Sequence, residues 1–378
     1  MHPRHTSLGL LIIALLMTIV SCIFLVYYIL HAGTNIPLLQ GFIRSSYMVN
    51  DETNATKTIP AQTPATLLAV GDIMLGRNVE RLTNENGRDY AFENITSFFQ
   101  TFNLVFANLE GPIPTLHRPT PSGSTTFSFV STTPTLLKRH NIGIVSLANN
   151  HLYDQGASNA TRTREKLQAE GILTVGDQKV VNESLITTST INGKNIVFVA
   201  LYDVFGALDE VKAQSLVKKT ADTTDAFVFL SIHWGDEYKL THNARQERIA
   251  HALIDAGADV IVGHHPHVVQ DIEMYQNKPI FYSLGNFIFD QYFSTDTQEG
   301  LAVGITLTDD QTTYTLFPID IVKSRAQLMD SDKKTPWLEA LAKRGEKNIS
   351  SAVVQGVITV NADPSFPTAE TIPQTTRS

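Results

Sequence analysis

Cysteine is almost absent from this chain, since Cys22 is the one cysteine among 378 residues. A single thiol excludes an intrachain disulfide framework and a zinc site built from several thiolates. Any metal ion bound by this chain must therefore be held by histidine, aspartate, glutamate or asparagine side chains.

Charge is also scarce: charged residues make up 17% of the chain, and the net charge is −8 at pH 7. An acidic chain has no broad electrostatic attraction to nucleic acid, so we expect no nucleic-acid partner. The hydrophobic content of 43% is typical of a folded globular protein and not of a disordered one.

Near the N-terminus, Leu8–Leu30 is apolar and contains no charged residue. About 20 residues cross a bilayer, whereas the apolar core of a cleavable signal peptide spans about 7–15 residues. We therefore expect a single-pass anchor in the cell membrane. Arg4 precedes the segment, so the positive-inside tendency places residues 1–7 in the cytoplasm and the remaining chain on the extracytoplasmic side.

An alternative interpretation of this segment is lipoprotein processing at Cys22, because Ile19–Cys22 resembles a bacterial lipobox. Against it, the apolar run continues to Tyr28, where a mature lipoprotein normally has a polar tether. A buried core helix is the third interpretation, and the lack of any polar face argues against it.

The remaining chain divides by composition into a stalk (31–65), one large domain (66–360) and a disordered tail (361–378). The stalk and the tail are rich in threonine and proline and contain little that a core would bury. Within the domain, helices are expected over 90–102, 157–170, 208–219 and 243–256. A β-hairpin is expected over 301–321, with its turn at Asp309-Asp310, and a further strand over 353–360.

Six apolar, strand-like runs each end in a polar cluster. In chain order the clusters are Gly71-Asp72, Asn108-Leu109-Glu110, Asn149-Asn150-His151, His233-Trp234-Gly235, His264-His265-Pro266-His267 and Gly285-Asn286. In an α/β protein, ligands bind beyond the carboxyl ends of the strands. The sequence therefore predicts a metal site that is assembled from the whole chain at one edge.

The chemistry of these side chains suits metal binding. His265 and His267 flank Pro266, and side chains two apart on an extended backbone point the same way, so both imidazoles can reach one ion. The further candidate ligands are Asp72, Glu110, Asn150 and His233. Nitrogen and oxygen ligands without sulfur suit Mn²⁺, Fe, Zn²⁺ or Mg²⁺, and there are enough of them for one or two ions.

Taken singly, each candidate has an ordinary structural interpretation. An aspartate after a strand is most often a turn or a helix cap, and an Asn-His pair usually belongs to a surface loop. Their shared position after six strands favours the metal site. We expect His264 to be exposed, and we expect the remaining histidines of the domain to be structural or solvated: His117, His140, His242 and His251.

Together with their neighbouring residues, the six clusters form longer motifs. These are Gly71–Arg77, Asn108–Gly111, Ala148–His151 with Asp154 and Gly156, His233–Gly235 with Glu237-Tyr238, Gly263–Val268 and Ser283–Phe287. In this order, over about 66–322, the chain resembles the CapA-type family of bacterial capsule and poly-γ-glutamate synthesis proteins. That family is similar in fold to the calcineurin-like metallophosphoesterases. The resemblance implies an α/β fold with a β-sandwich flanked by helices and with metals at the strand ends.

The resemblance also implies roles for individual residues. It makes Asp72 the first metal-binding aspartate and places Glu110 where the phosphoesterases have a bridging aspartate. The ligands implied further along the chain are Asn150, His233, His265 and His267. One histidine ligand is missing, because Ile73-Met74 follow Asp72 where the phosphoesterases have Asp-x-His.

Catalytic and substrate-binding roles follow from the same motifs. His151 is expected to act as general acid, and Asp154, three residues on, to orient its imidazole. Arg77 is expected to clamp an anionic group of the substrate. Glu237, Tyr238 and Asn286 are the further candidate substrate-binding residues.

Two hypotheses for function follow. The first is a membrane-anchored CapA-type protein that acts in capsule synthesis, export or anchoring through a metal-dependent, phosphoesterase-like hydrolase site on an anionic polymer or phosphoester. The second is a non-catalytic metal- or polymer-binding subunit of a membrane-bound capsule synthase. In both, the expected partners are the membrane subunits of that synthase.

Overall fold

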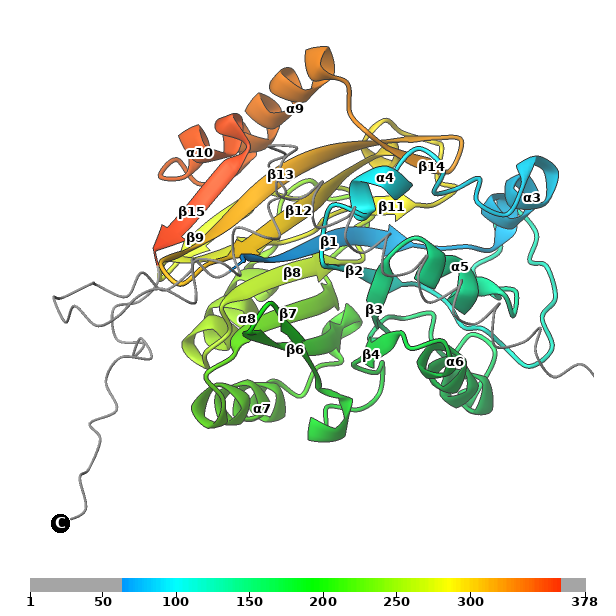
Figure 1. Ribbon diagram of the computed structural model, residues 1–378, viewed down its shortest axis with the longest axis horizontal. Coiled ribbons are helices and arrows are strands. Elements are labelled where there is room, and N and C mark those ends of the chain that lie inside the picture. The colour runs from blue at the N-terminus through cyan, green and yellow to red at the C-terminus, as the bar shows by residue number, and fades with distance from the viewer. Residues whose placement is uncertain (1–62, 362–378) are drawn as a thin grey trace, which may run out of the picture. The chain divides into compact units, whose positions relative to one another are not determined.

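The computed structural model describes residues 63–361, which form two β-sheets covered by helices (Figure 1). The first sheet comprises β1 (Ala65–Ile73), β2 (Leu104–Leu109), β3 (Ile142–Ser146), β4 (Leu173–Val175), β11 (Asn286–Ile288), β12 (Glu299–Leu307), β13 (Gln311–Val322), β14 (Arg325–Leu328) and β15 (Val357–Asn361). The second sheet comprises β5 (Thr187–Ile191), β6 (Lys194–Asp203), β7 (Phe227–Trp234), β8 (Val260–His264), β9 (Ile272–Tyr275) and β10 (Lys278–Phe281).

Parallel strands form one half of the first sheet and the centre of the second. In the first sheet β1, β2, β3 and β4 run parallel in this order, and β12 continues the sheet antiparallel to β1. In the second sheet β6, β7, β8 and β10 are parallel, with antiparallel strands β5 and β9 at the edges. Parallel strands bring their carboxyl ends to one edge, and the polar clusters therefore meet there.

Helices connect and cover the strands. They are α3 (Arg77–Asn86), α4 (Thr96–Phe99), α5 (Thr133–Arg139), α6 (Ala157–Ala169), α7 (Glu210–Thr223), α8 (Ala244–Asp255), α9 (Ser331–Arg344) and α10 (Ser350–Gln355), with short 3₁₀ turns η1 (Glu183–Leu185), η2 (Val204–Gly206) and η3 (Asp296–Gln298). At the start of α8, the Asn243 side chain accepts from the backbone N–H of Gln246, whose side chain accepts from the N–H of Asn243. This reciprocal capping box satisfies two donors that the first turn would leave unpaired.

Aromatic side chains hold the two sheets together. The Phe106 ring of β2 lies 4.7 Å from that of Phe229 on β7, and 6.1 Å from that of Phe198 on β6. All three rings are fully buried, and such contacts add to the free energy gained from burying apolar area. Separate apolar clusters lie beneath α4–α6 on the first sheet and beneath α7 and α8 on the second.

The structure confirms the mixed α/β class and most of the predicted elements. Helices α6, α7 and α8 lie where 157–170, 208–219 and 243–256 were predicted, and β12 and β13 form the expected hairpin. The helix predicted over 90–102 is wrong, because the structure keeps only the four residues of α4. The strand predicted over 353–360 begins late, since its first residues belong to α10.

The predicted anchor (8–30) and tail (361–378) lie outside the described residues, apart from Asn361. None of the helices within 63–361 combines the length and the apolarity that crossing a bilayer requires.

Candidate metal centre

The carboxyl ends of strands from both sheets bring the predicted ligands together. Pairing of β1 with β2 sets Asp72 opposite Asn108, two residues before Glu110. Pairing of β7 with β8 sets His233 opposite His264, one residue before His265. The sheets pack face to face, so carboxylates from the first sheet meet imidazoles from the second.

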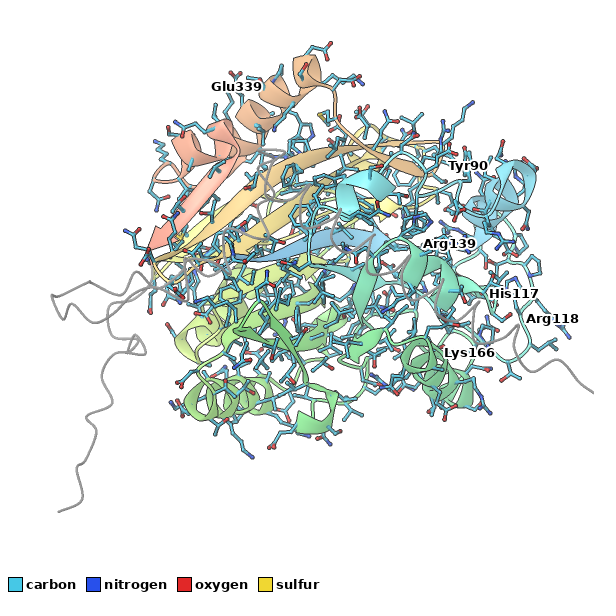
Figure 2. All side chains as sticks on the ribbon, in the orientation of Figure 1. Tyr90, His117, Arg118, Arg139, Lys166 and Glu339 are labelled. Atoms are coloured by element: carbon cyan, nitrogen blue, oxygen red, sulfur yellow. The ribbon has the colours of Figure 1, made fainter. Side chains whose placement is uncertain are left out.

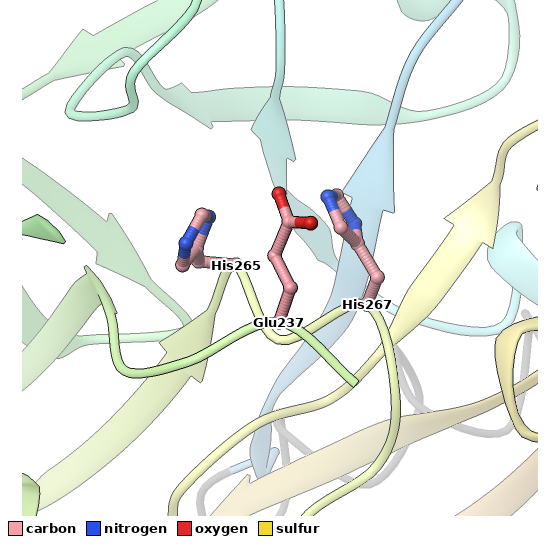
Figure 3. Close-up of side chains that lie close together, drawn as sticks. All are labelled: Glu237, His265 and His267. Atoms are coloured by element: carbon pink, nitrogen blue, oxygen red, sulfur yellow. The ribbon is translucent and has the colours of Figure 1, made fainter. Parts of the chain in front are cut away.

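Two groups of three side chains have ligand atoms close enough to share an ion. In one group, atoms of Asp72, Glu110 and His233 lie within 4.8 Å of one another, and all three residues are buried. In the other, atoms of Glu237, His265 and His267 lie within 4.8 Å (Figure 3). The groups adjoin, because Nε2 of His267 lies 3.7 Å from Oε1 of Glu110.

Asp72 is the most strongly held carboxylate of the site. Its Oδ1 accepts from Nδ2 of Asn108 at 2.8 Å and lies 3.0 Å from Nδ1 of His264. Burial alone would raise the pKa of Asp72, but hydrogen bonds and charge from His264 and His267 outweigh it and hold that pKa well below its usual value. The expectation that His264 is exposed is wrong: it is 1% exposed and supports Asp72.

Glu110 is buried with less support. Burial and the charge of Asp72 raise its pKa well above the usual value, and its Oε1 has no hydrogen-bond partner within the described residues. Nε2 of His264 and Nδ1 of His265 are likewise buried without partners there. Buried polar atoms are normally paired, because leaving one unpaired costs about 1–3 kcal/mol. A divalent cation within either group of ligand atoms would give a partner to Glu110 or to His265, so the donor set fits a metal.

The His265–His267 loop is strained and electrostatically uneven. Both histidines have positive φ, +96° and +57°, a region that non-glycine residues seldom adopt and that clusters at functional sites. Burial and the charge of His267 lower the pKa of His265 to about 4. Burial also disfavours charge on His267, but Glu110 and Asp72 raise its pKa to about 9.

His233 and Asn150 face each other across the two sheets, with Nε2 of His233 at 2.8 Å from Oδ1 of Asn150. Burial and the charge of His265 lower the pKa of His233 well below its usual value. A neutral imidazole and an amide oxygen are both competent metal ligands. The structure thus brings all six predicted ligands into one cluster.

The predicted acid lies at the edge of this cluster. Nδ1 of His151 is 2.8 Å from Oδ2 of Asp154, while Nε2 of His151 is 3.7 Å from Oε1 of Glu110. Oδ2 of Asp154 also accepts from the backbone N–H of Phe127, whose ring packs 4.0 Å from the imidazole. The imidazole is therefore held on one face and through one nitrogen, with the other nitrogen directed toward the ligands.

Arg77 lies nearby but already has partners. Its guanidinium pairs with Asp290, donates to the carbonyl of Ser124 at 2.9 Å, and lies over the rings of Phe127 and Phe289. The side chain is 11% exposed and that of Asp290 is 2% exposed. Arg77 is thus a fixed cation beside the site, and its contact with Asp290 was not foreseen from the sequence.

The remaining candidates fall in different places. Glu237 is exposed and lies beside His265 and His267, and Tyr238, 42% exposed, packs against Phe293 at the rim. Asn286 is fully buried, with Oδ1 at 3.0 Å from Nδ1 of His267 and its amide N–H groups donating within the protein. Asn286 is thus turned inward, where its side chain orients the imidazole of His267.

Sequence reasoning gave no role to Asn108, although it lies in one of the six motifs. Its amide contacts Asp72 at 2.8 Å, Glu110 at 3.4 Å and Nδ1 of His233 at 3.3 Å. Asn149 donates to Oδ1 of Asn108 at 3.0 Å, which orients that amide. The position of Asn108 at a strand end, two residues before Glu110, could have predicted that it lies at the site. Its neutral amide, however, is a weaker indication of a metal site than a carboxylate or an imidazole.

The other four histidines of the domain were expected to be structural or solvated, and the structure shows that each has a structural partner. His117 pairs with Glu80, His140 with Asp89, His242 with Asp271, and His251 with Glu273. Figure 2 shows His117 on the loop beyond β2. None of the four belongs to either group of candidate ligands.

Comparisons with known proteins agree with the motifs. The model of the bacterial capsule synthesis protein family PGA_cap matches residues 66–291. The capsule biosynthesis protein CapA of Bacillus anthracis is 32% identical over 65% of this chain and 65% of its own length, just under two thirds. The PGA biosynthesis protein CapA of Bacillus subtilis (strain 168) is 32% identical over 78% of this chain and 81% of its own length.

Among solved structures, a purple acid phosphatase from yellow lupin matches 71% of this chain and 53% of its own, with 10% identity and a TM-score of 0.35. The match over residues 66–291 covers more than half of the chain and includes each of the six motifs in order. The chain therefore belongs to the CapA-type family of bacterial capsule synthesis proteins.

Proposed function

We propose that this protein acts in the synthesis, export or anchoring of an anionic capsule polymer such as poly-γ-glutamate, through a metal-dependent hydrolase-like site. The observation that carries the proposal is the buried cluster of two carboxylates and three imidazoles, Asp72, Glu110, His233, His265 and His267, in which atoms of Glu110 and His265 have no partner within the described residues. The half-buried Asn150 joins this cluster through His233. The names of its relatives, a capsule biosynthesis protein and a PGA biosynthesis protein, support the assignment of a capsule polymer.

In this proposal the six clustered residues hold one or two divalent ions, of Mn, Fe, Zn or Mg. A bound divalent ion supplies a water of lowered pKa and polarises the oxygen of the bond that is cleaved. Asn108 and His264 hold Asp72 in place, and Asn286 does the same for His267.

His151 then acts as the general acid. Asp154 accepts from Nδ1–H of the protonated imidazole, and the second proton of that imidazolium, on Nε2, is the one donated to the leaving group. Phe127 limits rotation of the ring and excludes water from one of its faces. Arg77 is the residue that holds an anionic group of the substrate; although its guanidinium pairs with Asp290, its Nε has no hydrogen-bond partner within the described residues.

The location is part of the proposal. Leu8–Leu30 anchors the chain in the cell membrane and places the domain on the extracytoplasmic side, where a capsule polymer emerges. Membrane subunits of a capsule synthase are the partners that this location favours. The support is the uninterrupted apolar run in the sequence.

One observation favours the second candidate, a non-catalytic subunit. Met74 occupies the place where a phosphoesterase-like site would have a histidine ligand, and Met74 is fully buried in the core of the first sheet. A site that lacks this ligand can bind an ion or a polymer without cleaving it.

The two candidates are separated by measuring metal content and turnover on the same full-length preparation. We expect stoichiometric metal by elemental mass spectrometry, and cleavage of bis(p-nitrophenyl) phosphate or of a γ-glutamyl polymer that stops after chelation. Metal binding without turnover of either substrate would favour the non-catalytic subunit. A preparation that binds no divalent ion would overturn the metal site itself.

A further inference from the structure

A polar cavity of about 300 Å³ lies beside the candidate metal centre. Its walls are the first turns of α3 and the loop 119–122, which follow the carboxyl ends of β1 and β2. In α/β proteins this is the edge of the sheet where ligands bind. The volume is at the lower end of the range for ligand pockets, so the cavity has room for the end group of a ligand and not for a length of polymer.

Three side chains that line this cavity have a buried polar atom without a hydrogen-bond partner within residues 63–361. The atoms are Nε of Arg77, Oε2 of Glu80 and Oγ1 of Thr120. Glu80 is 7% exposed, so its carboxylate has lost most of its contact with water. Buried polar atoms are normally hydrogen-bonded, and leaving a charged group unpaired is the most costly case. A ligand group that donates to Glu80 and accepts from Arg77 would therefore complete these hydrogen bonds.

The surrounding structure fixes the Glu80 carboxylate in this position. Nε2 of His117 lies 2.8 Å from Oε1 of Glu80, and Nδ1 of His117, which Figure 2 labels, lies 2.9 Å from Oγ of Ser128. One carboxylate oxygen is thus held by the protein, and the other remains for a ligand. A Cβ at Gly76 would come within 3.4 Å of Oγ1 of Thr120, so the loop 119–122 packs closely against the start of α3.

Arg77 connects the cavity with the candidate metal centre. Its side chain lines the cavity, and its guanidinium lies 5.0 Å from the centre of the Phe127 ring, which packs 4.0 Å from the imidazole of His151. Arg77 has a φ of +50°, a strained conformation that persists where the fold needs a particular side-chain position. A ligand group in the cavity is therefore separated from the predicted general acid by one arginine and one aromatic side chain.

The charges around the cavity suit an end group that carries an ammonium and a carboxylate together. Glu80 is negative and Arg77 positive, and Arg81 adds a guanidinium at the rim, where its side chain is 56% exposed. In a polymer of γ-linked glutamate, the amino-terminal residue carries an ammonium and a carboxylate on the same carbon. Internal residues have an amide in place of the ammonium, and the carboxyl-terminal residue has two carboxylates. The amino-terminal residue alone thus offers a charged donor for Glu80 beside a carboxylate for Arg77.

We propose that this cavity binds the free amino end of a γ-glutamyl polymer. The terminal ammonium donates to Glu80 and Thr120, and the carboxylate on the same carbon accepts from Arg77. This assignment rests on the proposed function, from which it takes the polymer, and it adds a specificity for one end of that polymer. The polymer enters the site amino end first, and the residues that follow lie beside the metal centre. The assignment does not depend on the number or the identity of the metal ions.

The test is the binding of short glutamate peptides to the full-length protein, measured by titration calorimetry with a chelator present to prevent turnover. We expect γ-linked triglutamate to bind about tenfold more tightly than the same peptide with an acetylated amino end, because acetylation removes a charge-assisted hydrogen bond. The α-linked triglutamate has an ammonium but no carboxylate on the same carbon. It is expected to bind more weakly than the γ-linked peptide.

Two variants assign the effect to this cavity. Glu80→Gln is expected to lose the preference for the free amino end. Thr120→Val is expected to weaken that preference without loss of stability, because the Thr120 hydroxyl has no partner in the described part of the chain. The control is Glu165→Gln, an exposed glutamate on α6 that pairs with Arg162, and it is expected to keep the wild-type preference. None of the three variants changes a candidate metal ligand, so each is expected to keep the metal content of the wild type.

The outcomes separate the end-binding cavity from the proposed function. Equal binding of the free and the acetylated γ-linked peptides by the wild type would overturn the cavity's specificity alone. The same holds if α-linked triglutamate binds as tightly as the γ-linked peptide, or if Glu80→Gln and Thr120→Val both keep the wild-type preference. A wild type that binds neither these peptides nor long poly-γ-glutamate would overturn the polymer assigned in the proposed function, and the end-binding cavity with it.

Discussion

Nδ1 of His151 lies 2.8 Å from a carboxylate oxygen of Asp154, three residues further along the chain. This contact commits one ring nitrogen to a structural role and leaves the other facing the buried carboxylate of Glu110 at 3.7 Å. A histidine so held can transfer a proton without being needed as a ligand. This difference in role from the neighbouring Asn150 leads to the first prediction.

His151→Ala is expected to retain the metal and to lose hydrolytic turnover by about 10²–10⁴-fold, the usual contribution of a general acid. Asn150→Ala is expected to weaken metal binding as well, because its amide oxygen faces the imidazole of His233 at 2.8 Å. Elemental analysis and initial rates on both variants check this. If His151→Ala lost its metal, His151 would be a ligand and its assignment as the general acid would be wrong.

His265→Ala and His267→Ala are each expected to lower metal content and to lower the melting temperature in metal-replete buffer. When an ion binds only the folded state and its free concentration is about 100 times its Kd, it adds about 2.7 kcal/mol to the free energy of unfolding. Calorimetry with and without a chelator measures this increment for each variant. An increment equal to that of the wild type would contradict the assignment.

The matched control is His242→Ala, which is expected to keep the metal-dependent increment. His242 pairs with Asp271 at 2.8 Å and its ring stacks 3.9 Å from that of Tyr282. His242→Ala therefore lowers the melting temperature equally with and without metal.

The same contact makes stability depend on pH. Burial by itself lowers the pKa of His242, but its hydrogen bond to Asp271 and nearby carboxylates raise that pKa above the usual value. The stabilisation is thus complete below the pKa of the unfolded chain, about 6.5, and is lost as the pH rises through the higher pKa of the folded state. Urea unfolding with a chelator should show His242→Gln furthest below the wild type at about pH 5.5 and closer to it at about pH 9. A deficit independent of pH would exclude the charged pair.

The anchor prediction is tested on intact cells. Protease added outside is expected to digest the domain, and the purified membrane form is expected to keep its N-terminal residues 1–7. A mature N-terminus at Cys22 that carries lipid would replace the anchor by lipoprotein processing.

The elements and ligands that could be predicted from the sequence are those that depend on neighbouring residues. Asp72, and likewise Asn150 and His151, directly follow an apolar run. This local pattern predicts a strand that ends in a polar side chain, wherever the strand lies in the fold. The capping residue Asn243 likewise marks the start of α8. The prediction of a helix over 90–102 was wrong because successive turns, and not one face of a regular helix, bring Phe92 and Ile95 into the core.

The tertiary structure decided which strand ends meet and what each side chain faces there. His264 supports Asp72 across 192 residues of sequence, and Asn286 is turned inward to hold His267. Hydrophobic periodicity carries no information about either contact, because both depend on the order of strands within the sheets and on how the sheets pack. The sequence by itself thus determined the α/β elements and the ligand types, while packing decided the roles of Asn108, His264 and Asn286.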